Sequence, residues 1–293
     1  MNLIVGATGM VGTEICRLLA ASGKPVRAFV RTSSDPGKVE KLKRLGATIV
    51  QGDLRDNNSV KAACRGVTAV IATASAMPFS YKPNENTPQT TDQEGMLGLI
   101  ASAHDGGAKH IVYTSFPPME LSSPLQDAKQ AVEASLRTSG LTYTILRPTL
   151  FTEVWLGPAV GFDYANCKAT VYGTGENAIS WISLLDVAQF AVASLSNPAA
   201  RNVTLDLGGP EGISACKVVK VFERVFGKPF AVTNVPVEAL RGQYAAATDP
   251  MQKSFAALML GCSEIKAIDM APTLKAFPLK LRTVEEYARS VKA

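Results

Sequence analysis

The sequence predicts an α/β fold, a doubly wound parallel sheet with a smaller C-terminal α/β lobe. Over the first 150 residues, short apolar runs alternate with helical patterns. The runs are almost continuously apolar, which is typical of strands covered by helices on both faces. The chain has 293 residues, of which 46% are hydrophobic, enough for one large domain with a lobe around a real core.

Six apolar runs in the N-terminal half predict strands. They lie at residues 2–7, 26–31, 47–52, 69–75, 110–115 and 143–148. The segments between them predict helices near residues 11–22, 37–45, 57–64, 90–106 and 124–139. This alternation favours parallel strands joined by right-handed crossovers, with a ligand site at the carboxyl edge of the sheet.

After residue 150 the pattern is less regular. Residues 151–167 predict an irregular insert, and the runs ATVYG, ISWIS and VTLDLGG predict short strands. LLDVAQFAVASLS and SACKVVKVFERVFG predict amphipathic helices, and the chain from about residue 236 predicts further helices. We therefore expect a sheet domain at 1–150 and a smaller substrate-binding lobe at 151–293, partly interleaved with the first.

Composition argues against several classes of function. The net charge is +5, but the basic residues are scattered along the chain. The densest basic run, KVEKLKRLG, predicts a solvated helix face. No nucleic-acid partner is therefore expected. The five cysteines form no CxxC pair, which predicts reduced thiols, and His104 and His110 fit no metal spacing. With no leader and no apolar run near the ~18 residues of a membrane span, we expect a cytoplasmic protein without a membrane partner.

A glycine-rich loop follows the first predicted strand. VGATGMVG places Gly6, Gly9 and Gly12 between that strand and the next helix. Glycines at this spacing let the backbone approach a pyrophosphate, whose charge the helix N-terminus favours. The alternative is a tight turn with close helix packing. The sheet domain is thus expected to bind a dinucleotide in a Rossmann-like manner.

The end of the second strand selects the nucleotide. NAD sites usually have an acidic residue there, about 20 residues after the glycines. Here Arg31 occupies the place, followed by Thr32 and Ser33, whereas Asp35 comes later. A guanidinium with neighbouring hydroxyls suits a 2′-phosphate, which favours NADP(H), although Arg31 could also be a surface charge. Asp53, after the third strand, could accept from the adenine amino group with Leu54 against the ring, or could cap the next helix.

One lysine lies within an apolar helix stripe. On a helical wheel of residues 122–140, Lys129 falls between Leu125 and Leu136. An ammonium is costly to bury without a partner. Lys129 therefore either faces a functional group or reaches the surface from the edge of the stripe.

Several motifs together resemble the NmrA-like group of atypical short-chain dehydrogenases/reductases. These motifs are GATGMVG, the arginine that ends the second strand, GDLRD, IVYTS, LRP and ISWISLLDVAQFAVASL, and they cover about the first 210 residues. The group includes NADPH-dependent quinone reductases, plant isoflavone-type and benzylic ether reductases, and non-catalytic proteins that sense NADP(H). The resemblance implies cofactor contacts at Gly6, Ala7, Thr8, Gly9, Met10, Val11, Gly12, Arg31, Thr32, Ser33, Asp53, Leu54, Ala72, Thr73, Ala74, Ser75, Thr114, Lys129, Pro148 and Thr149.

The resemblance also implies two catalytic residues, Lys129 and Ser115. Ordinary short-chain reductases have Tyr-x-x-x-Lys on this helix, but the position four before Lys129 is Leu125. Three routes could replace the missing tyrosine. Lys129 could act as the general acid/base, Tyr81 could move in, or a substrate such as a quinone could take its proton from water.

The substrate side is expected to be apolar and aromatic. Phe79 and Tyr81 lie in the loop 76–92, and Phe151 and Trp155 follow the sixth strand. The alternatives are a solvent-exposed loop for the first pair and packing within the lobe for the second. A pocket with few polar anchors suits a flat quinone or enone better than a sugar or an acid.

We thus expect an NADPH-dependent oxidoreductase that transfers hydride to a small conjugated or aromatic carbonyl compound. The main alternative is a non-catalytic NADP(H)-sensing protein that binds a protein partner, which the missing tyrosine favours. A sugar-nucleotide epimerase or dehydratase ranks last, because such enzymes normally keep the tyrosine. The sequence leaves the oligomeric state open, a homo-oligomer included.

Overall fold

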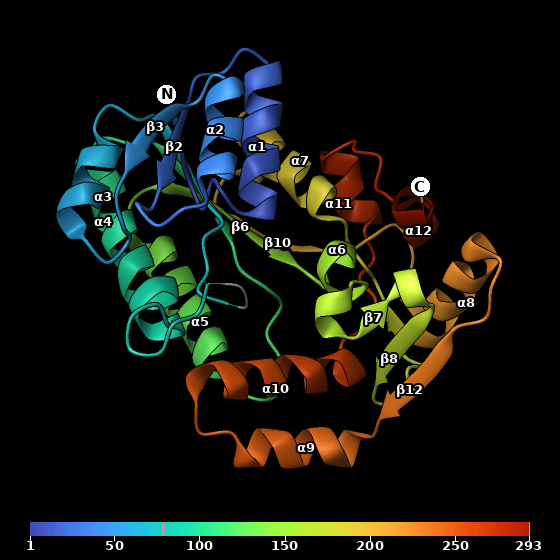
Figure 1. Ribbon diagram of the computed structural model, residues 1–293. Coiled ribbons are helices and arrows are strands. Elements are labelled where there is room, and N and C mark those ends of the chain that lie inside the picture. The colour runs from blue at the N-terminus through green and yellow to red at the C-terminus, as the bar shows by residue number, and fades with distance from the viewer. Residues whose placement is uncertain (78–79, 293) are drawn as a thin grey trace. The chain divides into compact units, whose positions relative to one another are not determined.

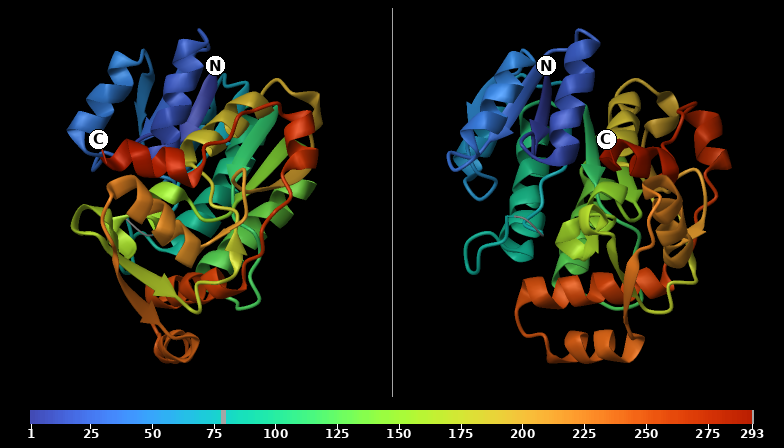
Figure 2. Two further views of the ribbon diagram at one scale, coloured as in Figure 1. Left: turned by 90° about the vertical axis from the view of Figure 1, so that its right-hand side faces the viewer. Right: turned by 45° about the vertical axis from the view of Figure 1, so that its right-hand side comes forward.

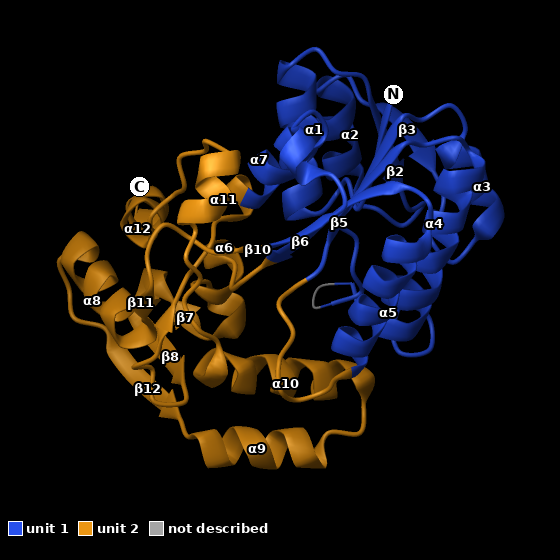
Figure 3. Ribbon diagram, turned by 180° about the vertical axis from the view of Figure 1, so that it is seen from behind, with its two compact units in different colours: residues 1–115, 124–147, 187–205 blue, residues 116–123, 148–186, 206–293 orange. Residues whose placement is uncertain are grey.

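The structure is a computed structural model that describes residues 1–77 and 80–292. The chain divides into two compact units (Figure 3). The first unit contains residues 1–115, 124–147 and 187–205, and the second contains residues 116–123, 148–186 and 206–293.

The first unit contains a seven-stranded sheet. Only the last residues of two of its strands belong to the second unit. The order of the sheet is β10-β6-β5-β4-β1-β2-β3, and the neighbouring pairs from β6 to β3 are parallel. The strands are β1 (Asn2–Val5), β2 (Val26–Val30), β3 (Thr48–Gln51), β4 (Ala69–Ala72), β5 (His110–Thr114), β6 (Thr142–Pro148) and β10 (Val203–Leu207). All six strands predicted from the N-terminal half are confirmed, and VTLDLGG supplies the seventh, at the edge.

Helices cover both faces of this sheet. Figures 1 and 3 show α1 and α2 on one face and α3, α4 and α5 on the other. Their bounds are α1 (Met10–Ala21), α2 (Pro36–Arg44), α3 (Asn57–Cys64), α4 (Met96–Asp105) and α5 (Pro124–Thr138), and α7 (Leu184–Ser194) lies beside α1. The doubly wound α/β fold that the sequence predicts is therefore confirmed.

The helix predicted near residues 90–106 has two parts. The first part, η1 (Pro88–Gly95), is a π-helix, and α4 continues directly from it. A capping box between Thr87 and Thr90 starts η1, with Pro88 in its first turn. Apolar periodicity could not reveal this, because the wider winding changes which residues share a face.

The core of the first unit explains why its strands are apolar throughout. Leu3, Val70 and Ile111 are buried in one cluster with Leu99 of α4 and Val132 of α5. The strand residues that alternate with them are equally buried, and they include Ile4, Ile71 and Val112. Both faces of the strands are thus covered, and burial of each such side chain contributes about 1.5–3 kcal/mol to stability.

The second unit is built on a small sheet of order β12-β8-β7. The strands of the unit are β7 (Phe162–Asp163), β8 (Lys168–Tyr172), β9 (Ala178–Ile179), β11 (Ile213–Ser214) and β12 (Ala231–Val235). Its helices are α6 (Thr152–Trp155), α8 (Ala215–Phe226), α9 (Val237–Ala246), α10 (Pro250–Glu264), α11 (Ala271–Ala276) and α12 (Val284–Lys292). Phe222 on α8 lies at the centre of an aromatic cluster, 4.7 Å from Phe162 and 6.1 Å from Phe230 between ring centroids.

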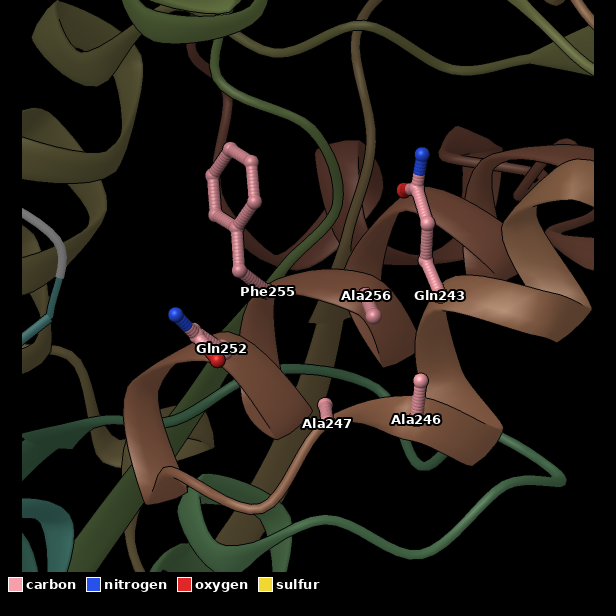
Figure 4. Close-up of a pocket in the computed structure, with 6 residues that line it drawn as sticks. All are labelled: Gln243, Ala246, Ala247, Gln252, Phe255 and Ala256. Carbon is pink, nitrogen blue, oxygen red and sulfur yellow. The ribbon is translucent and has the colours of Figure 1, made fainter.

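A hollow lies between two helices of the second unit. Both views of Figure 2 show α9 and α10 side by side. The hollow has a volume of about 320 Å³, and Figure 4 shows the side chains that line it, Gln243, Ala246, Ala247, Gln252, Phe255 and Ala256. None of the site residues predicted from the sequence lines it.

Candidate functional site

The predicted site residues of the first unit gather at the carboxyl edge of its sheet. β1 and β4 are neighbours there, and the chain order of the strands reverses between them. In open α/β sheets ligands bind at such a switch point. Most of the predicted cofactor residues of this unit lie in or beside the loops after β1, β2, β3, β4 and β5, whereas Lys129 lies on α5.

The three glycines of the loop after β1 have three different environments. Gly6 has φ +88°, and a Cβ there would lie 2.7 Å from the Ala74 backbone nitrogen. A Cβ on Gly12 would overlap the Gly6 carbonyl oxygen. Gly9 is different, because among the described residues its Cβ would meet only the Gly6 oxygen, at 3.1 Å. Gly6 is thus needed for the turn and Gly12 for packing, whereas the side of Gly9 is open for a ligand.

The N-terminus of α1 is suited to an anion. Gly9 is its N-cap, and within residues 1–77 and 80–292 no side chain caps the helix and no acidic residue lies in its first turn. Met10 is 47% exposed at the same end, which is unusual for a large apolar side chain. Unsatisfied N–H groups and the helix dipole favour a phosphate here.

The segment after β4 lies against the glycine loop. The Thr73 backbone N–H donates to the Val5 carbonyl at 2.9 Å, and the Thr73 hydroxyl would lie 2.8 Å from a Cβ on Gly6. The Ser75 hydroxyl accepts a hydrogen bond from the Met77 N–H at 3.1 Å. The structure therefore brings the two longest runs of predicted cofactor residues together, Gly6–Gly12 and Ala72–Ser75.

The polar residues after β2 and β3 form a charged cluster. Arg31, Thr32 and Ser33 are exposed directly after β2. Arg55 binds both carboxylate oxygens of Asp53, with Nε and Nη2 each at 2.8 Å. These hydrogen bonds lower the pKa of Asp53, and the positive charge of Arg31 adds to the effect.

One sequence interpretation changes at this cluster. The alternative role of Asp53 as a helix cap is wrong, because Asp56 caps α3 by accepting from the Asn58 N–H. Asp35, which follows too late for a ribose contact, caps α2 through the Lys38 N–H. Leu54 is buried in the core of the unit, so its contact with an adenine ring stays a prediction.

Lys129 faces a carboxylate. It is 7% exposed, and its Nζ lies 3.3 Å from Asp92 Oδ1 and donates to the Thr114 carbonyl at 3.2 Å. The Nζ is also 5.0 Å from the centroid of the Tyr113 ring. The alternative that Lys129 reaches the surface is therefore wrong. Asp92 was missed from the sequence, because it lies in the π-helix η1 and no local pattern links it to Lys129.

Buried hydroxyls surround the end of β5. Within the described part of the chain, Tyr113 OH, Thr114 Oγ1 and Ser115 Oγ lack a hydrogen bond of normal geometry. Ser115 lies close enough to Glu133 to affect its charge. Burial alone would raise the pKa of Glu133, but hydrogen bonds from Arg147 and Arg137, together with the nearby Ser115 hydroxyl, lower it below its usual value. Burial raises the pKa of Tyr113 well above its usual value, and the charges of Asp92 and Glu133 add to this rise.

In the described part of the loop 76–92, residues 82–85 are exposed, as the alternative of a solvent-exposed loop implies, whereas other residues are buried. Asn86 is buried, donates to the Ser80 carbonyl and accepts from the Thr91 hydroxyl. Arg55 also donates to the Glu85 carbonyl at 2.7 Å. Tyr81 is half-buried, and Phe79 lies outside the described residues. The substrate contacts of both aromatics stay predictions.

Four predicted residues belong to the second unit. Pro148 and Thr149 are buried, and the Thr149 hydroxyl donates to the Ser180 carbonyl. Phe151 is half-buried as the N-cap of α6. Trp155 packs against both hydrophobic clusters of the unit, which supports the alternative of packing within the lobe. Contacts of these residues with a cofactor or substrate stay predictions.

None of the predicted site residues is a cysteine or a histidine. All five cysteines are free in the structure. His110 is half-buried, and its Nε2 lies 2.8 Å from Thr144 Oγ1, whereas His104 is exposed at the end of α4. No group of His, Cys, Asp and Glu side chains within residues 1–77 and 80–292 could hold a metal ion. In the same part of the chain, no helix is long and apolar enough to cross a membrane.

Known proteins resemble this chain along most of its length. The sequence pattern of the NmrA-like family matches residues 2–288. The NAD(P)H azoreductase of Xenophilus azovorans is 30% identical over 81% of this chain and 78% of its own. The photosystem II assembly factor Ycf39 of Trieres chinensis is 29% identical over 82% of this chain and 73% of its own. An Escherichia coli NADPH-dependent quinone oxidoreductase, solved with NADPH, shares the fold with a TM-score of 0.80 at 22% identity, and both chains are fully covered.

Proposed function

Because this chain belongs to the NmrA-like family, we propose that it is an NADPH-dependent oxidoreductase that transfers hydride to a small conjugated or aromatic carbonyl compound, such as a quinone or an enone. The general activity, that of an oxidoreductase that uses NAD(P)H, is supported by the azoreductase among its relatives and by the quinone oxidoreductase of the same fold. The preference for NADPH and the class of substrate are argued from the site itself.

The observation that carries the proposal is the glycine loop. A dinucleotide needs one position where the backbone is bare and open, and Gly9 supplies it at an uncapped helix N-terminus. Gly6 and Gly12 are held by close contacts with the protein itself. The residues present therefore fit a pyrophosphate, and Met10 would cover part of it.

Arg31 supports NADPH over NADH. It lies where an NAD site would have an acidic residue, and its exposed guanidinium is beside two exposed hydroxyls, Thr32 and Ser33. Asp53, the acidic side chain nearby, is neutralised by Arg55. The cluster thus presents positive charge to a 2′-phosphate.

When bound, the cofactor supplies a hydride. The chain's own residues at this edge supply positive charge and hydrogen-bond donors, with Lys129 and Ser115 at the end of β5. Leu125 takes the place of the usual tyrosine and is buried. A quinone or enone suits such a site, because the oxygen that receives negative charge after hydride addition can take a proton from water.

A second candidate function is an NADP(H)-responsive protein that binds a protein partner. The missing tyrosine at Leu125 favours it, and so does the likeness to Ycf39, which is named as an assembly factor. Steady turnover distinguishes the two candidates.

The test follows NADPH and NADH absorbance in parallel with quinones, enones and aromatic aldehydes, for the wild type and Lys129→Ala. We expect turnover with NADPH, little with NADH, and a large loss in the variant. Binding of NADPH without turnover on any compound would favour the second candidate, and a preference for NADH would contradict the role of Arg31.

A further inference from the structure

We propose that Asp92 is a positioning residue that holds Lys129 as a fixed ammonium, so that Lys129 serves the reaction as a cation and hydrogen-bond donor and does not transfer its proton to the substrate. This inference rests on the proposed function. It adds a residue that the sequence did not indicate and selects among the three routes by which the missing tyrosine could be replaced.

Asp92 connects three segments of the first unit. One carboxylate oxygen, Oδ2, accepts from the Ala76 backbone N–H at 2.9 Å, just after the predicted cofactor segment Ala72–Ser75. The other, Oδ1, faces Lys129 Nζ on α5 at 3.3 Å. Asp92 itself is fully buried in η1. A single carboxylate therefore fixes the loop after β4 and the lysine relative to each other.

Burial makes the charges of this pair interdependent. Removing a carboxylate or an ammonium from water is costly unless the opposite charge lies beside it. The side chain of Asp92 is 0% exposed and that of Lys129 is 8% exposed. Each charge thus needs the other beside it, and removal of either one by substitution would leave the other buried without its partner.

The other groups around Lys129 also favour the ammonium. The Thr114 carbonyl accepts one of its N–H groups, and the Tyr113 ring lies within the distance at which a cation is attracted to an aromatic face. Glu133, one turn further along α5, is already bound by Arg147 and Arg137. Lys129 donates one N–H group to Thr114 and forms an ion pair with Asp92, so an N–H group remains for an oxygen of the cofactor or substrate.

The consequence for the reaction is a division of roles. Hydride addition to a conjugated carbonyl compound leaves negative charge on the carbonyl oxygen, and a fixed ammonium stabilises that charge. The proton that completes the hydroxyl group comes from water. Because water supplies the proton and Lys129 stabilises the negative charge, the site needs no tyrosine as a proton donor, and Leu125 is tolerated.

The test uses Asp92→Asn, which keeps an oxygen acceptor for the Ala76 N–H but removes the charge. Glu94→Gln is the matched control, because Glu94 is an exposed carboxylate on the same helix. The readouts are kcat with a benzoquinone and the Kd of NADPH, each measured from about pH 7 to about pH 9.5, because burial without an opposite charge disfavours a charged side chain.

We expect kcat of Asp92→Asn to fall about tenfold or more across this range, and kcat of the wild type and Glu94→Gln to change less than about twofold. A profile of Asp92→Asn parallel to that of the wild type would overturn the inference while leaving the proposed function intact. A wild type that fails to bind NADPH would instead overturn the proposed function.

Asp92→Glu keeps the inference testable if Asp92→Asn does not fold. It retains the charge but moves it by one methylene group. We expect a lower kcat with an unchanged KM for NADPH and a flat pH profile. An unchanged kcat in this variant would show that the position of the carboxylate does not matter and would overturn the inference.

Discussion

Gly9→Ala should separate binding of the cofactor from stability of the fold. Gly9 has φ −75° and ψ 168°, which alanine adopts without strain. Its new methyl group would meet only the Gly6 oxygen among the described residues, at 3.1 Å, so a shift of a few tenths of an ångström suffices. We expect the free energy of unfolding without ligand to change by less than about 1 kcal/mol.

The same methyl group would occupy the open side of the loop, where we place the pyrophosphate. Loss of two hydrogen bonds to a charged group, at about 1.5–3 kcal/mol each, corresponds to a loss of affinity of about 100-fold or more. Urea unfolding with and without NADPH measures both effects. At a concentration 100 times its Kd for the wild type, NADPH should stabilise the wild type by about 2.7 kcal/mol and Gly9→Ala by less than about 0.5 kcal/mol.

Gly12→Ala is the control for a purely structural glycine. Its Cβ would overlap the Gly6 carbonyl oxygen, which is backbone and cannot move freely. We expect a loss of stability of about 1–3 kcal/mol without ligand. Equal stabilisation of Gly9→Ala and the wild type by NADPH would refute the reasoning, because the open side of Gly9 would then not be where the cofactor binds.

Three further predictions concern charged groups. Arg31→Ala should lower the preference for NADPH over NADH by about tenfold or more, as kcat/KM for the two cofactors measures, and an unchanged ratio would place the 2′-phosphate elsewhere. Burial raises the pKa of Asp186 to about 6 from its ordinary 3.8, so the folded state holds more protons than the unfolded state between these values and stability falls as pH rises through them. Asp186→Asn should therefore be more stable than the wild type by about 1–3 kcal/mol in urea unfolding at pH 7, and the two should differ little below about pH 4. Glu133→Gln should lower the free energy of unfolding by about 2–3 kcal/mol at pH 7, because Arg147 and Arg137 lose a buried partner. Since the pKa of Glu133 is lowered in the folded state, the difference in stability between the variant and the wild type should disappear as the pH falls below that pKa. A constant difference across the acid range would contradict this role of Glu133.

The strands and the glycine loop of the first unit could be predicted well, because the sequence patterns that indicate them are local. Strands buried on both faces are apolar throughout, so the runs 2–7 and 69–75 predicted where β1 and β4 begin, although they extended two and three residues beyond the ends of these strands. The glycine spacing predicted the loop after β1, because a turn and a close helix packing each exclude a side chain.

What could not be predicted depends on contacts between distant segments. A helical wheel showed that Lys129 needed a partner, but it could not identify Asp92, which lies far from Lys129 in the chain and within a π-helix. Strand β12 was missed, because four of its five residues are exposed and lack an apolar pattern. The small sheet that β12 forms with β8 is a tertiary feature, which propensity alone does not determine.

The most direct test of the proposed function is to follow the hydride itself. NADPH that carries deuterium at the reactive carbon of its nicotinamide ring would be incubated with the protein and a set of enones and aromatic aldehydes. We expect NADP⁺ and product in equal amounts, with deuterium on the carbon that accepts the hydride. Bound NADPH that remains unoxidised with every compound would contradict the account and indicate a protein that binds the cofactor without using it.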